Sequence, residues 1–153
     1  MTILNIFEPQ TTDKLLHRIS ELAPNTFPLW GKMDVAQMLA HCSVAYDQAF
    51  DENPKRPNAF VRFMLRMLLK DRLTNSTTPY KKNSGTAPAF LITDARDFET
   101  EKARLVVYIQ RVEKLGAKYF EHKESASLGK LNSYEWNNLF YKHLDHHLSQ
   151  FGV

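Results

Sequence analysis

The chain has 153 residues, 43% of them hydrophobic and 24% charged, and its formal net charge is +3 at pH 7. This length and composition predict one globular domain over residues 1–153 and exclude a chain that is disordered throughout. The single cysteine, Cys42, excludes an intrachain disulfide framework. No apolar run approaches the roughly 20 residues of a spanning helix, and the first ten residues do not resemble a signal peptide. We therefore expect a cytoplasmic protein without a membrane span.

Helical patterns cover five segments of the chain. The first spans about residues 12–23, where leucine and isoleucine recur at helical spacing before Pro24. The second begins at Asp34, which forms a capping-box pattern with Gln37, and runs to about residue 50. Further helices are predicted over 59–72, from 97 to 116 and from 133 to 151. Residues 74–89 and 119–131 are predicted to be irregular connections, with a brief extended piece at 89–93.

The simplest architecture for these segments is all-α: a four-helix bundle with a short extra helix and long connecting loops. The last helix has its own capping-box pattern, because Glu135 stands three residues after Asn132. Gly152 is expected to end that helix.

The short helix over 59–72 is strongly basic on one face, because Arg62, Arg66 and Lys70 recur every four residues. Its other face carries apolar residues: Phe60, Phe63, Met64, Met67 and Leu68. We expect a lid that packs its Phe and Met side chains on the bundle and leaves its arginines in water. The alternative is a surface for acidic lipid or nucleic acid. Aromatic and basic residues do not alternate as in single-strand binders, so no nucleic-acid partner is expected.

Two histidines of the last helix, His143 and His147, are four residues apart and therefore lie one turn apart on the same face. At about 100° per residue they point into the sector that also holds Trp136 and Phe140, which indicates an inward orientation. Two such imidazoles can chelate one metal ion, but a complete site needs a third ligand from another helix. His41 of the second helix is the candidate. The alternative for His143 and His147 is an interfacial pair that is hydrogen-bonded to neighbouring helices, and the alternative for His41 is a core histidine with satisfied hydrogen bonds.

Four other polar residues have competing interpretations. His146 replaces His147 as a ligand if the last helix is slightly rotated. Gln37 and Gln150 either orient a ligand histidine or serve structural roles. We expect Cys42 to be a buried, small apolar residue rather than a nucleophile.

The residues around these histidines resemble the DinB-like (YfiT-like) metalloprotein superfamily, and in particular a DinB-related branch of uncharacterised bacterial proteins. The resemblance is carried by residues 30–42 (WGKMDVAQMLAHC), 97–105 (DFETEKARL) and 136–152 (WNNLFYKHLDHHLSQFG). It implies an up-down-down-up four-helix bundle. It also implies a metal site with one histidine from the second helix and a His-x-x-x-His pair from the last, which correspond here to His41, His143 and His147.

The same resemblance implies a divalent ion, which is zinc, nickel, iron or manganese in such proteins, although some of them are metal-free. Characterised members include thiol-dependent transferases and isomerases that act on small electrophiles. We therefore expect a metal-dependent hydrolase or a thiol-dependent transferase, with a small-molecule substrate or a thiol cosubstrate. A homodimer is also expected. The alternative is a non-enzymatic helical bundle, without metal, that binds a ligand or another protein.

Overall fold

The structure is a computed structural model that describes residues 2–153. Within these residues it is mostly helical, with five α-helices, one short 3-10 helix and one two-stranded sheet. The helices are α1 (Pro9–Ser20), α2 (Val35–Phe50), α3 (Ala59–Thr74), η1 (Pro88–Phe90), α4 (Phe98–Phe120) and α5 (Ser133–Gln150), and the strands are β1 (Glu124–Ser125) and β2 (Gly129–Lys130).

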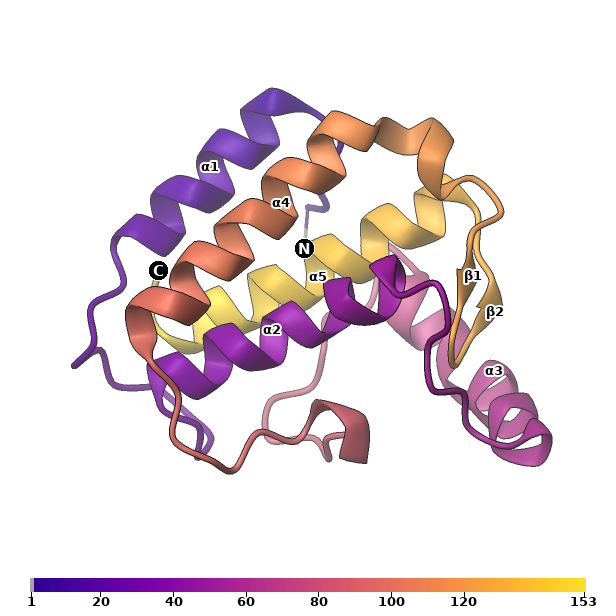
Figure 1. Cartoon of the computed structure of the whole chain (residues 1–153), viewed down its shortest axis with the longest axis horizontal. Coiled ribbons are helices and arrows are strands. Elements are labelled where there is room, and N and C mark those ends of the chain that lie inside the picture. The colour runs from indigo at the N-terminus through magenta and orange to yellow at the C-terminus, as the bar shows by residue number, and fades with distance from the viewer. Residues whose placement is uncertain (1) are drawn as a thin grey trace.

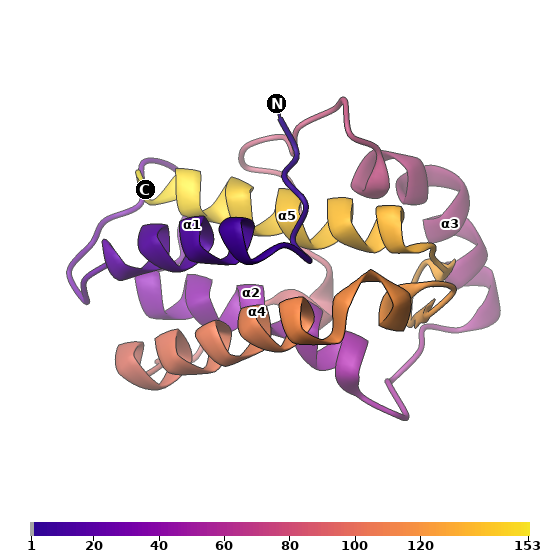
Figure 2. The ribbon, with the colours of Figure 1, turned by 90° about the horizontal axis from the view of Figure 1, so that it is seen from above.

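Four of these helices, α1, α2, α4 and α5, lie side by side, as the two ribbon views in Figures 1 and 2 show. Helices α2 and α4 run in the same direction, and α1 and α5 run in the opposite one (Figure 1). Helix α3 stands apart at one end and contacts α5. The early part of α2 therefore lies opposite the late part of α5, which places His41 beside His143 and His147.

The helix ends follow the local signals in the sequence where those signals are strong. Both capping boxes form: Asp34 accepts from the backbone N–H of Gln37, and Asn132 accepts from that of Glu135. Helix α1 starts earlier than expected, because Pro9 occupies its first turn, where a missing N–H costs no hydrogen bond. Helix α4 continues past its expected end, but Gly116 has a φ of 69° and interrupts the helical geometry there.

The core lies between α1, α2, α4 and α5 and includes a stack of aromatic rings. Tyr46 of α2 stacks between Tyr108 of α4 and Phe140 of α5, with ring centroids 5.6 and 4.7 Å away. Fully buried aliphatic side chains from all four helices fill the rest: Leu15, Ile19, Met38, Leu39, Leu105, Ile109, Leu144 and Leu148. Burial of this apolar surface is the main force that holds the helices together.

Helix α3 is attached in the opposite orientation to the one expected. Its basic face turns toward the body: Arg62 donates to Glu124 at 2.7 Å, and Lys70 pairs with Glu135 at 2.9 Å. Its large apolar side chains are exposed. The prediction of a lid with buried Phe and Met residues is therefore wrong, because carboxylates on β1 and α5 bind the basic face.

The C-terminal end of α3 is fixed by a buried lysine from α5. The Lys142 side chain is fully buried, and its ammonium donates to the carbonyl oxygens of Arg72 and Asn75, each at 2.9 Å. Asn138 adds a hydrogen bond of 2.7 Å to the Thr74 carbonyl. Carbonyls at a helix C-terminus lack intrahelical partners, so these donors satisfy the last turn of α3.

The two long connections contain short ordered elements. Residues 88–90 form the 3-10 turn η1 rather than the expected extended piece, with Pro88 in its first position. Within the second connection, β1 and β2 form a two-residue antiparallel hairpin in which Glu124 pairs with Lys130. Within residues 2–153, no helix combines the length and hydropathy that crossing a membrane requires.

Candidate metal centre

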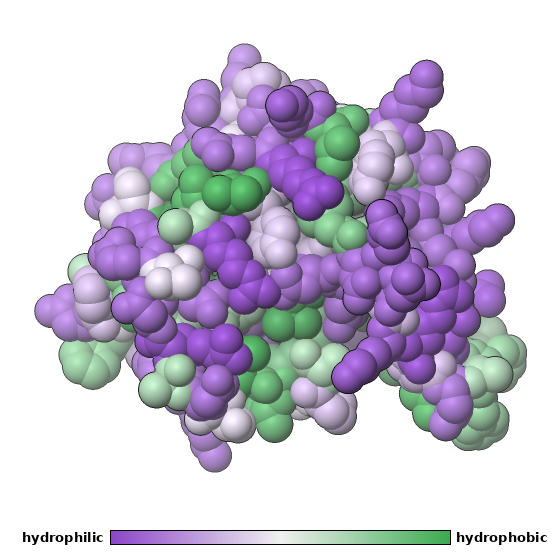
Figure 3. Space-filling view, in the orientation of Figure 1, coloured by the Kyte–Doolittle hydropathy of each residue, from purple (hydrophilic) through white to green (hydrophobic). Residues whose placement is uncertain are grey.

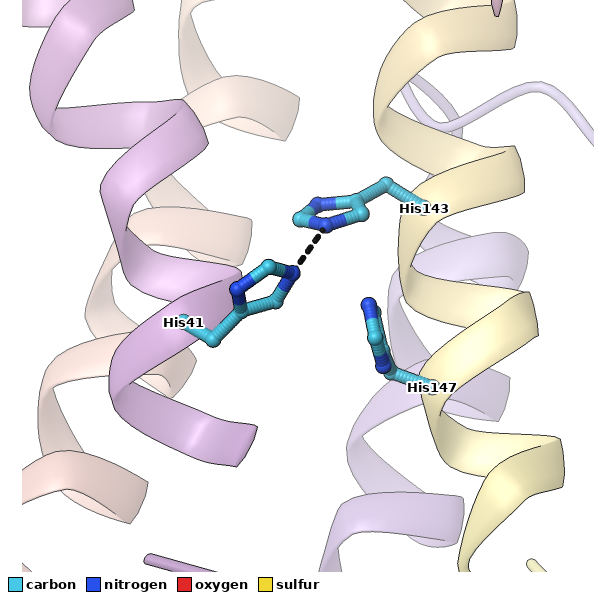
Figure 4. Close-up of side chains that lie close together, drawn as sticks. All are labelled: His41, His143 and His147. Carbon is cyan, nitrogen blue, oxygen red and sulfur yellow. Dashed lines mark hydrogen bonds between the residues drawn. The ribbon is translucent and has the colours of Figure 1, made fainter. Parts of the chain in front are cut away.

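Three histidine side chains from two helices converge at one point inside the protein. His41 comes from α2, and His143 and His147 come from α5 (Figure 4). Their ring centroids lie 4.5 to 4.9 Å apart, and the Nε2 atoms of His41 and His143 are 2.9 Å apart. One nitrogen from each ring lies within 4.8 Å of the others. The structure thus brings together the three histidines that the sequence singled out.

A backbone carbonyl fixes the orientation of His41. Its Nδ1 lies 2.8 Å from the carbonyl oxygen of Phe90 in η1. A carbonyl can only accept, so Nδ1 carries the proton and the Nε2 lone pair of neutral His41 points at the other two rings. The Phe90 ring also packs against His41 and His143, with centroid distances of 5.6 and 5.9 Å. Segment η1 therefore both orients one imidazole and covers part of the cluster.

Gln150 fixes His147 in the same way through a short relay. The Gln150 amide nitrogen donates to the Trp30 carbonyl at 2.6 Å, which leaves its Oε1 facing His147 Nδ1 at 2.8 Å. His147 must then donate from Nδ1, and its Nε2 lone pair is free. Gly31 makes room for this relay, because a Cβ there would lie 2.4 Å from the Gln150 amide nitrogen. Of the two glutamines considered as ligand-orienting residues, Gln150 occupies that position.

Burial keeps the cluster electrically neutral. Burial lowers the pKa of His41, although its bond to the Phe90 carbonyl acts in the opposite direction. Burial and the neighbouring imidazoles lower the pKa of His143 well below its ordinary value. Burial is also the main reason that the pKa of His147 falls to about 3. All three rings are therefore neutral at pH 7, which is the form that binds metal ions.

The donor set fits a divalent metal ion. Two of the three rings have Nδ1 bound to an acceptor and Nε2 directed inward, which is how proteins orient metal-binding histidines. At a metal–nitrogen distance of about 2.1 Å, tetrahedral ligands lie about 3.4 Å apart. The separations in this cluster, from 2.9 Å to at most 4.8 Å, bracket that value. Three protein ligands would leave further coordination positions for water or substrate.

The remaining candidate residues have other roles. The His146 ring packs edge-on against His147 and Trp30, and it is not one of the three converging rings. Gln37 donates to the Asp94 carbonyl and completes the capping box of α2, so it is structural. Cys42 is fully buried, which raises the pKa of its thiol. These features match the interpretation of Cys42 as a packed apolar residue.

Sequence reasoning missed the two backbone carbonyls that orient the rings. Phe90 and Trp30 act through their main-chain oxygens. Every residue has such an oxygen, so no side-chain pattern could have found them. Gln150 could be considered from sequence because it lies one turn beyond His147 on the same helix.

The fold and this cluster together define a mostly helical protein with three converging histidines from two facing helices. A family model matches residues 6–152, and the chain belongs to that family, whose description is "Protein of unknown function (DUF1569)". No curated protein matches the chain, and no solved structure does so either.

Proposed function

We propose that this protein is a DinB-like four-helix-bundle protein that holds one divalent metal ion on His41, His143 and His147. The observation that carries the proposal is the pair of independent hydrogen bonds on Nδ1 of His41 and His147. Each bond leaves an Nε2 lone pair directed at the same point. Packing in a core does not require two histidines to direct their Nε2 lone pairs at the same point. The directions of α1, α2, α4 and α5 support the bundle assignment.

We further propose that the centre serves a metal-dependent hydrolase or a thiol-dependent transferase that acts on a small molecule. A divalent ion bound by neutral ligands supplies Lewis acidity and lowers the pKa of a bound water or thiol. Three neutral imidazoles contribute no negative charge, so the full positive charge of the ion would remain available to polarise a substrate. The chain itself holds the ligand nitrogens in place through Phe90 and Gln150, and the Phe90 ring covers part of the cluster. His143 is only partly buried, which supports approach of a small molecule from its side.

The test is metal content by inductively coupled plasma mass spectrometry on untagged protein. We expect about one equivalent in the wild type and little in a His143→Ala, His147→Ala double variant. The matched control is a His17→Ala, His122→Ala double variant, which removes as many imidazoles from exposed positions and none of the three converging rings. Metal loss in the control, or no metal in any variant after addition of zinc, nickel or manganese, would contradict the proposal.

Activity is tested next on the metal-loaded protein. Screens for ester and amide hydrolysis and for thiol transfer to small electrophiles should show turnover that the ligand double variant lacks and the control retains. A protein that binds metal but shows equal background in all three forms would leave the centre without a catalytic role. A metal-free wild type would instead favour the non-enzymatic binding protein, in which His143 Nε2 donates to His41 Nε2 at 2.9 Å.

A further inference from the structure

Helix α3 presents an exposed apolar face that nothing in the described chain covers. Phe60 is 73% exposed, Met67 69% and Leu68 66%. Phe63 and Met64 extend the same face, because residues three and four apart lie together on a helix. The space-filling view in Figure 3 shows hydrophobic residues gathered over the projecting part of the molecule that Figure 1 labels α3. We define this surface, Phe60, Phe63, Met64, Met67 and Leu68, as the α3 apolar face.

The cations of α3 are not part of this face. Arg62 donates to Glu124, as does Arg56 just before the helix, and Lys70 pairs with Glu135, so these side chains are directed toward β1 and α5. Arg66 lies over Gly129 of β2, 3.4 Å from the position that a Cβ would take there. An amphipathic helix that binds anionic lipid needs the cations of its polar face free to reach the headgroups. Ion pairs with Glu124 and Glu135 engage Arg62 and Lys70 of α3 instead.

The size of the face matches half of a small, stable interface. A fully exposed Phe side chain presents about 150–250 Å² of surface, and Met and Leu are of similar size. The exposed fractions of the five side chains therefore leave on the order of 600 Å² of apolar surface accessible. That is at the upper end of the largest patch on a typical monomer, about 300–600 Å². Two such faces against each other would bury about 1,200 Å², which is the lower limit for specific association.

We propose that the α3 apolar face is the interface with a second copy of this chain, with the two α3 helices packed antiparallel about a two-fold axis near Met64 and Met67. The face is apolar throughout and therefore complementary to itself, as a two-fold interface requires. Asp71, exposed beyond the C-terminal end of the face, would then lie beside the N-terminus of the partner's α3. Negative charge is favourable at the N-terminus of a helix. In an antiparallel pair, the Asp71 of each copy would lie at the N-terminus of the other copy's α3.

The α3 apolar face is separate from the proposed metal centre, because α3 lies at one end of the molecule and holds none of the three histidines. Its test is sedimentation velocity of the full chain across a range of concentrations. We expect a species of twice the 17.8 kDa monomer in the wild type. Met67→Glu should be monomeric at the same concentrations, since each copy would bury a carboxylate in the apolar interface. The matched control is Phe27→Glu, which makes the same change at a side chain that is 84% exposed and lies outside α3.

A rescue experiment keeps the test independent of folding defects. Met67→Lys alone should also be monomeric, but an equimolar mixture with Met67→Glu should recover dimers, because the opposite charges lie close to each other near the two-fold axis. A monomeric wild type, or a dimer that Met67→Glu leaves intact, would overturn the proposal. A monomer that binds anionic vesicles through Met67 would overturn it as well, in favour of a lipid surface.

Discussion

Gly31→Ala is the sharpest single test of how the chain orients its histidines. Gly31 has a φ of 89°, a region that disfavours residues with a Cβ. A Cβ at this position would lie 2.4 Å from the amide nitrogen of Gln150. Gln150 must then move away from the Trp30 carbonyl, and its hydrogen bond to His147 is lost or misaligned.

The expected effect has two separable parts. The left-handed backbone conformation costs an alanine about 1–2 kcal/mol of folding free energy. For a chain of this size, 1 kcal/mol lowers Tm by about 2–4 °C. The loss of the Gln150 hydrogen bond should weaken metal binding by about 10-fold or more, which corresponds to about 1.4 kcal/mol.

The assay combines thermal unfolding of the metal-free protein with zinc titration against a competing chelator. Gly116→Ala is the matched control, because Gly116 has a φ of 69° and no atom lies within 4 Å of its hypothetical Cβ. Both variants should lose stability, but only Gly31→Ala should lose zinc affinity. Wild-type affinity in Gly31→Ala, or an equal loss in Gly116→Ala, would refute the relay from Trp30 through Gln150 to His147.

Three other predictions concern the body of the protein. Lys142→Met should lower the free energy of unfolding, measured in urea, by about 1–3 kcal/mol, because the carbonyls of Arg72 and Asn75 lose a charged donor. Lys118→Met, which changes an exposed lysine, should have little effect. An unchanged midpoint for Lys142→Met would contradict the assigned role. Burial raises the pKa of the Cys42 thiol, so Ellman's reagent should react with this thiol only as fast as the protein unfolds. Rapid reaction of the folded protein would be inconsistent with the burial of Cys42. Glu124→Gln should lower the free energy of unfolding by less than about 1 kcal/mol, because the ion pairs of Glu124 are partly exposed. It should still accelerate amide hydrogen exchange in α3. Unchanged exchange in α3 would show that these ion pairs do not hold the helix.

Local interactions explain which parts of this protein could be predicted from the sequence. Asp34 with Gln37, and Asn132 with Glu135, satisfy backbone donors within one helical turn, so the starts of α2 and α5 do not depend on distant residues. The spacing of His143 and His147 sets their common face in the same way. Residue type and spacing are therefore enough to select His143 and His147, whereas the resemblance of residues 30–42 indicated His41 as the third ligand.

Which face of a helix is buried depends on the surfaces around it, and here the tertiary structure decided the outcome. The amphipathic pattern of α3 was clear, but Glu124 and Glu135, more than fifty residues further along the chain, turn its cations inward. The orientation of the imidazoles likewise depends on the main-chain oxygens of Phe90 and Trp30, which no residue type marks. Short-range spacing was enough to predict the helices and the common face of His143 and His147, whereas nothing local links His41 to that pair. Only the packing of distant segments decided how those histidines are held and which side of α3 remains open to a partner.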